Sequence, residues 1–194
     1  MDFPGSNACF FTLPFIIHFL CFQRAAMTLE PLLVVIEISA IVVFAISGLI
    51  EAVRKRMDAV GVFAVAFVTA FGGGTLRDVL LDRRPLFWVQ HQEYVWLVLA
   101  LTLIGPPLLR VFRHQWVDRV MQATDALGLG LFAVSGASLA LVAGMPLIVV
   151  VLMGVITGVF GGVLRDVLCN EIPVVFHDHR PYALCAFCGC WVFI

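Results

Sequence analysis

The chain has 194 residues, of which 62% are hydrophobic and 13% are charged, and its formal net charge is −1. So few polar residues cannot cover the surface of a water-soluble domain of this size. The charge gives no clustered basic surface of the kind that binds nucleic acid, so none is expected as a partner. The composition therefore indicates an integral membrane protein that lies in a lipid bilayer.

Residues 1–26 do not fit the pattern of the rest of the chain. Their apolar run is short for a bilayer span and is interrupted by Pro14 and His18. Arg24 follows this run, whereas the basic region of a signal peptide precedes its apolar core. We expect translation to begin at Met27 and residues 1–26 to lie outside the fold, the alternative being an uncleaved extra anchor.

The remainder of the chain predicts membrane-spanning helices joined by short polar loops. In chain order, the predicted spans are Leu32–Ala52, Val60–Leu81, Tyr94–Val111, Val120–Ala143, Pro146–Cys169 and Ala183–Ile194. Gly105-Pro106-Pro107 in the third span predicts a bend or a break. No polar flank follows the last segment, so we expect five complete spans and an incomplete sixth in a truncated chain.

Two halves of the chain repeat the same sequence at a constant distance. Phe44–Gly48 (FAISG) recurs as Phe132–Gly136 (FAVSG), at an offset of 132 − 44 = 88 residues. Gly73–Leu80 (GGTLRDVL) recurs as Gly161–Leu168 (GGVLRDVL) at the same offset. The same offset pairs Glu37 with Asp125, Thr69 with Thr157, Pro85 with Pro173, His91 with His179 and Tyr94 with Tyr182. One offset without a gap indicates an internal duplication.

Each repeat holds three predicted spans, with 27–114 as the first repeat and 115–194 as an incomplete second. Because three is odd, the second repeat enters the membrane from the opposite side. We therefore predict an all-α membrane protein built from two inverted three-helix repeats. Transporters and channels that bind their solute near the middle of the membrane use this architecture.

Basic residues in the loops predict the orientation, because cytoplasmic loops carry the excess of Lys and Arg. The loops on one side carry Arg54, Lys55, Arg56, Arg110, Arg113, Arg119 and Arg180. The other side carries Arg24, Arg83 and Arg84. The first side is therefore predicted to be cytoplasmic, with the N-terminus outside.

Glycines lie at matching positions of the second and fifth spans, as Gly72, Gly73 and Gly74 and as Gly161 and Gly162. Each glycine costs a helix about 1 kcal/mol relative to alanine. A broken helix at membrane depth is tolerated where its backbone is buried or lines a water-filled cavity, and freed carbonyls can replace the hydration shell of a cation. We expect a break or kink in both helices beside a pore, the alternative being close helix packing through small residues.

Two charged pairs, Arg77-Asp78 and Arg165-Asp166, follow these glycines. A charge that faces lipid costs roughly 2.5–3.5 kcal/mol on insertion scales, and such charges usually have a function. Adjacent positions on a helix do not face each other, so we expect neither aspartate simply to neutralise the arginine before it. The alternative is that both charges reach from a helix end to the lipid headgroups.

The direction of each span predicts which acids these arginines meet. The first span runs inward past Glu37 and the second runs outward past Arg77, so both side chains lie at the outer mouth. Inversion of the repeat places Asp125 and Arg165 together at the inner mouth. An ionised acid at each mouth enriches cations there. We predict two acid–arginine pairs that flank a constriction lined by glycines.

Nothing in the sequence indicates an enzyme or a cofactor, since a nucleophile with a matched base, a phosphate loop and a dinucleotide fingerprint are all missing. Cys185, Cys188 and Cys190 lie in an apolar segment without a second ligand pair at metal-site spacing. His177-Asp178-His179 lies in a predicted loop. We expect packed cysteines and solvated loop residues here, and no metal site.

The doubled GG-x-LRDVL and FA-x-SG motifs resemble the bacterial branch of the trimeric intracellular cation (TRIC-type) channel family, also catalogued as the glycine transporter domain family. The resemblance runs from about Met27 to the C-terminus. It implies seven helices, as two inverted three-helix units and a last helix. It also implies a homotrimer in the bacterial inner membrane, with one pore per subunit that passes monovalent cations such as potassium.

In that family the second and fifth helices are kinked at glycines and line the pore, which here implicates Gly72, Gly73, Gly74, Gly161 and Gly162. This sequence departs from the family in its N-terminal extension, its incomplete sixth helix and the absence of a seventh. Its second glycine cluster has two adjacent glycines where the first has three.

Three functions stay open at this point. The first is a potassium-permeable channel, and the second is a carrier for glycine or another small amino acid that works by alternating access. The third is a non-conducting fragment or a membrane assembly module. Unsaturated, electrogenic potassium flux indicates the channel, and saturable glycine uptake indicates the carrier.

Overall fold

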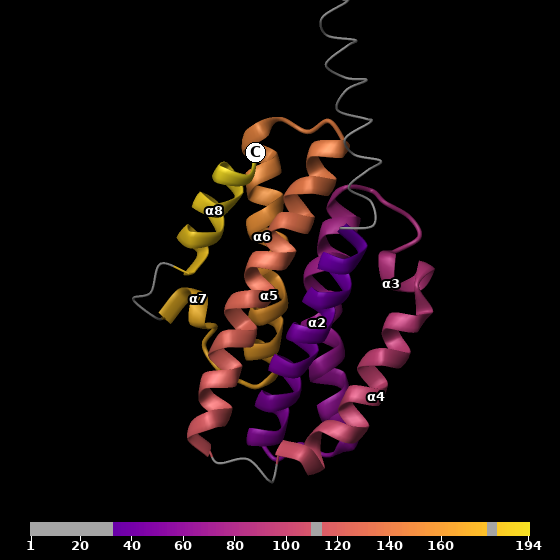
Figure 1. The fold of residues 1–194 in the computed structure, drawn as a ribbon, viewed down its shortest axis with the longest axis vertical. Coiled ribbons are helices and arrows are strands. Elements are labelled where there is room, and N and C mark those ends of the chain that lie inside the picture. The colour runs from indigo at the N-terminus through magenta and orange to yellow at the C-terminus, as the bar shows by residue number, and fades with distance from the viewer. Residues whose placement is uncertain (1–32, 110–113, 178–181) are drawn as a thin grey trace, which may run out of the picture. The chain divides into compact units, whose positions relative to one another are not determined.

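The structure is a computed structural model that describes residues 33–109, 114–177 and 182–194. The expectation for residues 1–26 lies outside these described residues. Residues 36–194 form one compact unit, and all the contacts reported below lie within it. In chain order, the helices are Leu33–Arg54 (called here the first helix), α2 (Ala59–Leu80), α3 (Phe87–Gln90), α4 (Gln92–Leu109), α5 (His114–Val142), α6 (Leu147–Leu168), α7 (Val174–His177) and α8 (Tyr182–Phe193) (Figure 1).

Among the residues that the structure describes, four stretches of helix are long and apolar enough to cross a membrane, namely the first helix, α2, residues 119–142 of α5, and α6. The structure is thus the multi-pass, all-helical membrane protein that the composition indicated. The helix ends differ from the predicted spans by a few residues, most at α5, which begins at His114 where Val120 was expected. Two short helices, α3 and α7, were not predicted, and they follow α2 and α6 respectively.

Helix α4 corresponds to the third predicted span and has 18 residues. At 1.5 Å per residue its length is about 27 Å, close to the thickness of the hydrocarbon layer. The helix continues through Pro106 and Pro107 to Leu109, so it is not broken at this site, and the bend that was the other expectation stays a prediction. Both prolines fall in the last turn, and because proline has no N–H, each removes a hydrogen bond to the carbonyl four residues before it.

Helices α2 and α6 continue without interruption through their glycines, so neither helix is broken there, and the expected kink stays a prediction. The glycines instead let two backbones touch. A Cβ atom on Gly73 would lie 2.1 Å from the carbonyl oxygen of Thr157, and one on Gly161 would lie 2.5 Å from that of Thr69. Close packing through small residues, the alternative weighed above, is what the structure has.

The crossing of α2 and α6 has two-fold character. Gly73 contacts Thr157, and Thr69 contacts Gly161, so a later residue of α2 meets an earlier residue of α6. The two helices therefore run antiparallel, as inverted repeats require. The 88-residue offset converts each of these contacts into the other, which makes the repeats meet through equivalent surfaces.

The remaining helices pack around this crossing (Figure 1). Helix α4 contacts α2, and α8 contacts both α5 and α6. The first helix and α5 meet through Phe44 and Phe132, whose rings stack with their centroids 5.4 Å apart. These two phenylalanines are themselves related by the repeat offset, so the aromatic stack extends the two-fold contact to a second pair of helices.

Candidate functional site

The first candidate site surrounds Arg77 in the last turn of α2, a side chain with no exposed surface. Its Nη1 donates to Oε1 of Glu37 at 2.9 Å and to Oγ of Ser135 at 3.0 Å. Its Nε donates to Oδ1 of Asp78 at 2.9 Å. The ring of Phe87 lies over the guanidinium, with Cζ 5.2 Å from the ring centroid. One buried cation thus joins the first helix, α2, α3 and α5.

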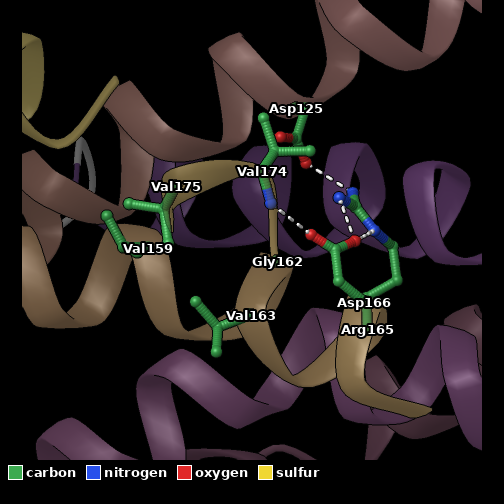
Figure 2. A pocket seen from close by; sticks show the side chains of 8 residues that line it. All are labelled: Asp125, Val159, Gly162, Val163, Arg165, Asp166, Val174 and Val175. Atoms are coloured by element: carbon green, nitrogen blue, oxygen red, sulfur yellow. Dashed lines mark hydrogen bonds and ion pairs between the residues drawn. The ribbon is translucent and has the colours of Figure 1, made fainter. Parts of the chain in front are cut away.

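The second candidate site surrounds Arg165 in the last turn of α6, whose side chain is 1% exposed. Its Nη1 hydrogen-bonds Oδ1 of Asp125 and Oγ of Ser47. Its Nε donates to Oδ1 of Asp166 at 2.9 Å. Figure 2 shows the carboxylates of Asp125 and Asp166 on either side of this guanidinium. The predicted pairs of Glu37 with Arg77 and of Asp125 with Arg165 are therefore both present.

The two sites are linked because each arginine bonds a serine from the other repeat. Arg77 of the first repeat contacts Ser135 of the second, and Arg165 of the second contacts Ser47 of the first. These serines are the ones in the doubled FA-x-SG motif. Neither serine was predicted as a site residue, although both recur at the same offset as the arginines.

Both arginines also pair with the aspartate that directly follows them, contrary to expectation. Nη2 of Arg77 lies 2.8 Å from Asp78, and Nη2 of Arg165 lies 2.7 Å from Asp166. The rule that adjacent helix positions do not face each other concerns the direction of their Cβ atoms. A long arginine side chain can fold back until its guanidinium meets the next carboxylate. Because both arginines are buried, the alternative of snorkelling to the headgroups is wrong as well.

Each of these aspartates also fixes the start of a short helix. Oδ2 of Asp78 accepts a hydrogen bond from the backbone N–H of Phe87 at 2.9 Å. Oδ2 of Asp166 accepts one from the backbone N–H of Val174 at 3.1 Å (Figure 2). A carboxylate is a favourable acceptor for the free N–H groups at a helix start. The loops that leave α2 and α6 are thereby tied back to the buried arginine sites.

The two acids at each site differ in exposure. The side chains of Glu37 and Asp125 are 17% and 14% exposed, whereas those of Asp78 and Asp166 are 2% and 6% exposed. Each site therefore carries one acid that is closed off and one that is partly accessible. With one guanidinium for two carboxylates, each site has an excess of negative charge, which favours the approach of a cation.

The five predicted glycines divide between the helix crossing and the two sites. Gly73 and Gly161 lie at the crossing, and Gly72 faces a leucine side chain of α6. Gly74 lies beside the first site, where an aromatic ring covers it. Gly162 lies beside the second site, where the nearest atoms to an added Cβ are 3.7 Å and 3.9 Å away.

A small pocket opens at the second site (Figure 2). Asp125 of α5, Val159 and Gly162 of α6 and Val175 of α7 line it, together with the buried ion pair. Its volume, counted as the space open to the centre of a water molecule, is about 10 Å³. That is room for one water molecule or one small ion.

Outside the spans, an exposed ion pair joins two loops at one end of the bundle. The ammonium group of Lys55, just after the first helix, hydrogen-bonds Oε1 of Glu171, just after α6. This hydrogen bond raises the pKa of Lys55. Both loops therefore lie at the same end, as the predicted topology requires.

Metal ligands do not gather in the described part of the chain, where no group of three His, Cys, Asp or Glu side chains is placed to hold an ion. The side chains of 177–179 lie outside the described residues. Cys190 is buried, and a Cβ on Gly154 would lie 2.5 Å from its sulfur, so this cysteine packs α8 against α6.

Comparison with known proteins gives a family for this chain. The family model described as Glycine transporter matches twice, over residues 34–106 and 122–194. The start of the second match follows that of the first by 122 − 34 = 88 residues, the offset of the internal repeat.

Curated relatives are membrane proteins described only by a family number. A UPF0126 membrane protein of Vibrio cholerae is 38% identical over 161 residues, which are 81% of this chain and 66% of the relative. The chain thus spans just under two thirds of that protein. The UPF0126 inner membrane protein YadS of Escherichia coli K12 is 38% identical over 156 residues, which are 79% of this chain and 74% of the relative.

Solved structures with the same fold are TRIC channels. The trimeric intracellular cation channel orthologue from Rhodobacter sphaeroides is 35% identical, with a TM-score of 0.78 over 83% of this chain and 81% of that one. A second TRIC cation channel is 40% identical, with a TM-score of 0.72 over 81% of this chain and 76% of that one. The chain therefore belongs to the glycine transporter domain family, the membrane protein family that includes the TRIC-type channels.

Proposed function

We propose that the protein conducts monovalent cations, potassium among them, across a bacterial inner membrane. The observation that carries this proposal is the likeness to the cation channel orthologue of Rhodobacter sphaeroides, at 35% identity over 83% of the chain. The two buried ion-pair sites support it, because each has more negative than positive charge and one partly exposed acid.

The proposed path runs between the two repeats, alongside α2 and α6. Glu37 and Asp125 attract cations at its two ends, and the neighbouring arginines limit how strongly a cation is held. A site that binds too tightly would stop conduction, so this balance matters. The glycines at the crossing form the constriction between the ends, and their weak helix propensity lets α2 and α6 bend when the path opens.

The assembly and orientation belong to the same proposal. We infer a homotrimer with one path per subunit, which the description of the Rhodobacter protein as trimeric supports. We also infer the fold boundaries at 27–114 and 115–194 and an external N-terminus, which the basic loops support. A cysteine introduced as Arg54→Cys should react with a membrane-impermeant reagent only from the cytoplasmic side. Reaction from outside would overturn the orientation.

A carrier for glycine is the second candidate function, and the description of the family model favours it. A carrier binds its solute in a closed site and opens alternately to each side. The pocket at Asp125 has room for one water molecule, which is less than glycine needs. We therefore rank the channel first.

Reconstitution of the chain into liposomes distinguishes the two candidates. A potassium gradient is imposed, and the membrane potential and the uptake of labelled glycine are followed in the same preparation. The channel predicts a potential that follows the potassium gradient and a flux that does not saturate. Saturable glycine uptake without an electrogenic potassium flux would establish the carrier instead.

A further inference from the structure

The surroundings of the two arginine sites differ systematically in aromatic content. Equivalent positions are related by the 88-residue offset. Aromatic residues of the first repeat correspond, at this offset, to non-aromatic or exposed residues of the second. The pairs are Phe63 and Val151, Phe67 and Val155, Phe71 and Val159, Phe87 and Val175, and Trp88 and Phe176. The charged groups of the two sites match, whereas these aromatic positions differ.

In the first repeat these aromatic side chains form one cluster that fastens α3 onto α2. The ring centroids of Phe67 and Phe71 are 4.7 Å apart, and those of Phe71 and Phe87 are 5.8 Å apart. The ring of Trp88 meets that of Phe67 at 5.6 Å. Its Nε1 donates to Oγ1 of Thr75 at 3.1 Å. The position of α3 is thus fixed by rings and by a hydrogen bond.

Within this cluster, Phe87 covers the first arginine site. Its side chain is buried, and a Cβ atom on Gly74 would lie 2.4 Å from Cε1 of its ring. The same ring lies over the guanidinium of Arg77. The space beside the glycine and the arginine is therefore filled by an apolar group.

The equivalent space in the second repeat is partly empty. Val175 replaces the phenylalanine, and the pocket lies beside Gly162, which is equivalent to the covered glycine of the first repeat. Val159, the equivalent of Phe71, lines the same pocket. Phe176, the equivalent of Trp88, is 75% exposed and does not fill it.

We propose that Phe87 is a plug that closes the path at the first-repeat end, while the second-repeat end stays open to a water-sized cavity at Val175. An apolar ring at a constriction excludes water, and a cation cannot pass where it loses its water without replacement ligands. Passage then requires the ring to leave Gly74 and Arg77, so the plug regulates the site at one end of the path. The effect of the plug on cation passage rests on the proposed cation channel. Its exclusion of water from the Arg77 site does not.

Potassium flux in liposomes tests the plug with repeat-matched substitutions. Phe87→Val gives the first site the residue of the second, and we expect it to raise the flux about tenfold, a barrier change of about 1.4 kcal/mol. Phe87→Leu retains more of the volume and should raise it less. Val175→Phe should lower the flux by filling the cavity. Phe176→Val removes an exposed aromatic from the same region and should leave the flux unchanged.

Amide hydrogen exchange tests the plug without relying on conduction. In the wild type, the backbone N–H of Phe87 should exchange more slowly than that of Val174, although each donates to an aspartate, Asp78 or Asp166, that directly follows a buried arginine. Phe87→Val should remove this difference.

The two measurements separate failure of the plug from failure of the channel. If the wild type carries no potassium flux but the exchange difference is present and is removed by Phe87→Val, the proposed function fails and the plug stands as a barrier to water. If the wild type conducts and Phe87→Val leaves both flux and exchange unchanged, the plug is wrong.

Discussion

The Arg77 and Arg165 sites share the same frame of hydrogen-bonding partners around the arginine, but differ in the side chain that covers it. In both, a buried arginine binds the aspartate after it, an acid from the first helix of its own repeat and a serine from the other repeat. The cover is aromatic at Phe87 and aliphatic at Val175. The hydrogen-bonding partners, which join the two repeats, are equivalent at both sites, whereas the covering residues Phe87 and Val175 differ.

Energetics explains this division. An arginine buried away from water has to be paired and hydrogen-bonded, and removal of one partner leaves an uncompensated charge. A serine that serves the opposite repeat cannot change without harming that repeat's arginine. A residue that merely fills space can change size at a lower cost, so Phe87 and Val175 were free to differ.

Replacement of the arginines should have the largest effect. Arg77→Met leaves Glu37 and Asp78 without their cation, and the protein should lose about 3–5 kcal/mol of stability. Arg165→Met should cost less, because the pocket at that site admits water to the acids left behind. Thermal unfolding in detergent measures both variants. A larger loss for Arg165→Met would contradict the contrast between a covered and an open site.

The cross-repeat serines should have the next largest effect. Ser135→Ala removes one hydrogen bond to the charged guanidinium of Arg77, which should cost about 1.5–3 kcal/mol. Ser47→Ala should cost a similar amount at Arg165 if the frame is equivalent in both repeats. The same thermal measurement applies. A loss at one serine and none at the other would show that only one cross-repeat bond matters.

The glycines at the crossing should have a smaller but equal effect on both repeats. Gly73→Ala and Gly161→Ala each place a Cβ against a backbone carbonyl, so α2 and α6 must separate, at about 1–3 kcal/mol. Gly130→Ala in α5 is the control, because an added Cβ there meets nothing within 4 Å. Its better helix propensity should leave stability unchanged or slightly raised. Equal unfolding temperatures for all three variants would contradict the close backbone contact.

Sequence reasoning predicted the helices and the pairing of charges better than the local geometry. Hydropathy placed the spans, and the direction of each span placed Glu37 beside Arg77, because depth in a bilayer restricts which polar groups can meet. The pairing of Arg77 with Asp78 was missed, since it depends on how a long side chain folds back. The continuous helix through Gly73 was missed because tertiary packing outweighs a local propensity of about 1 kcal/mol.

The covers of the two sites were also beyond the sequence analysis. The offset already aligned Phe87 with Val175, so the difference was visible in the printed sequence. Its meaning depended on α3, a four-residue helix that hydropathy does not detect. The N–H of Phe87 bonded to Asp78 brings the ring onto Arg77, and this contact between the start of α3 and the end of α2 has no periodic signal.

Potassium flux through Glu37→Gln tests most directly whether the acid–arginine pairs lie on the cation path. Glutamine keeps an oxygen that can accept the hydrogen bond from Arg77 but removes the charge that enriches cations. Asp125→Asn is the matched change at the other end. We predict that both variants fold, as judged by their unfolding temperatures, and that each lowers the flux by roughly tenfold or more. Wild-type flux through a folded Glu37→Gln variant would contradict this, and would show that the pair only holds the helices together.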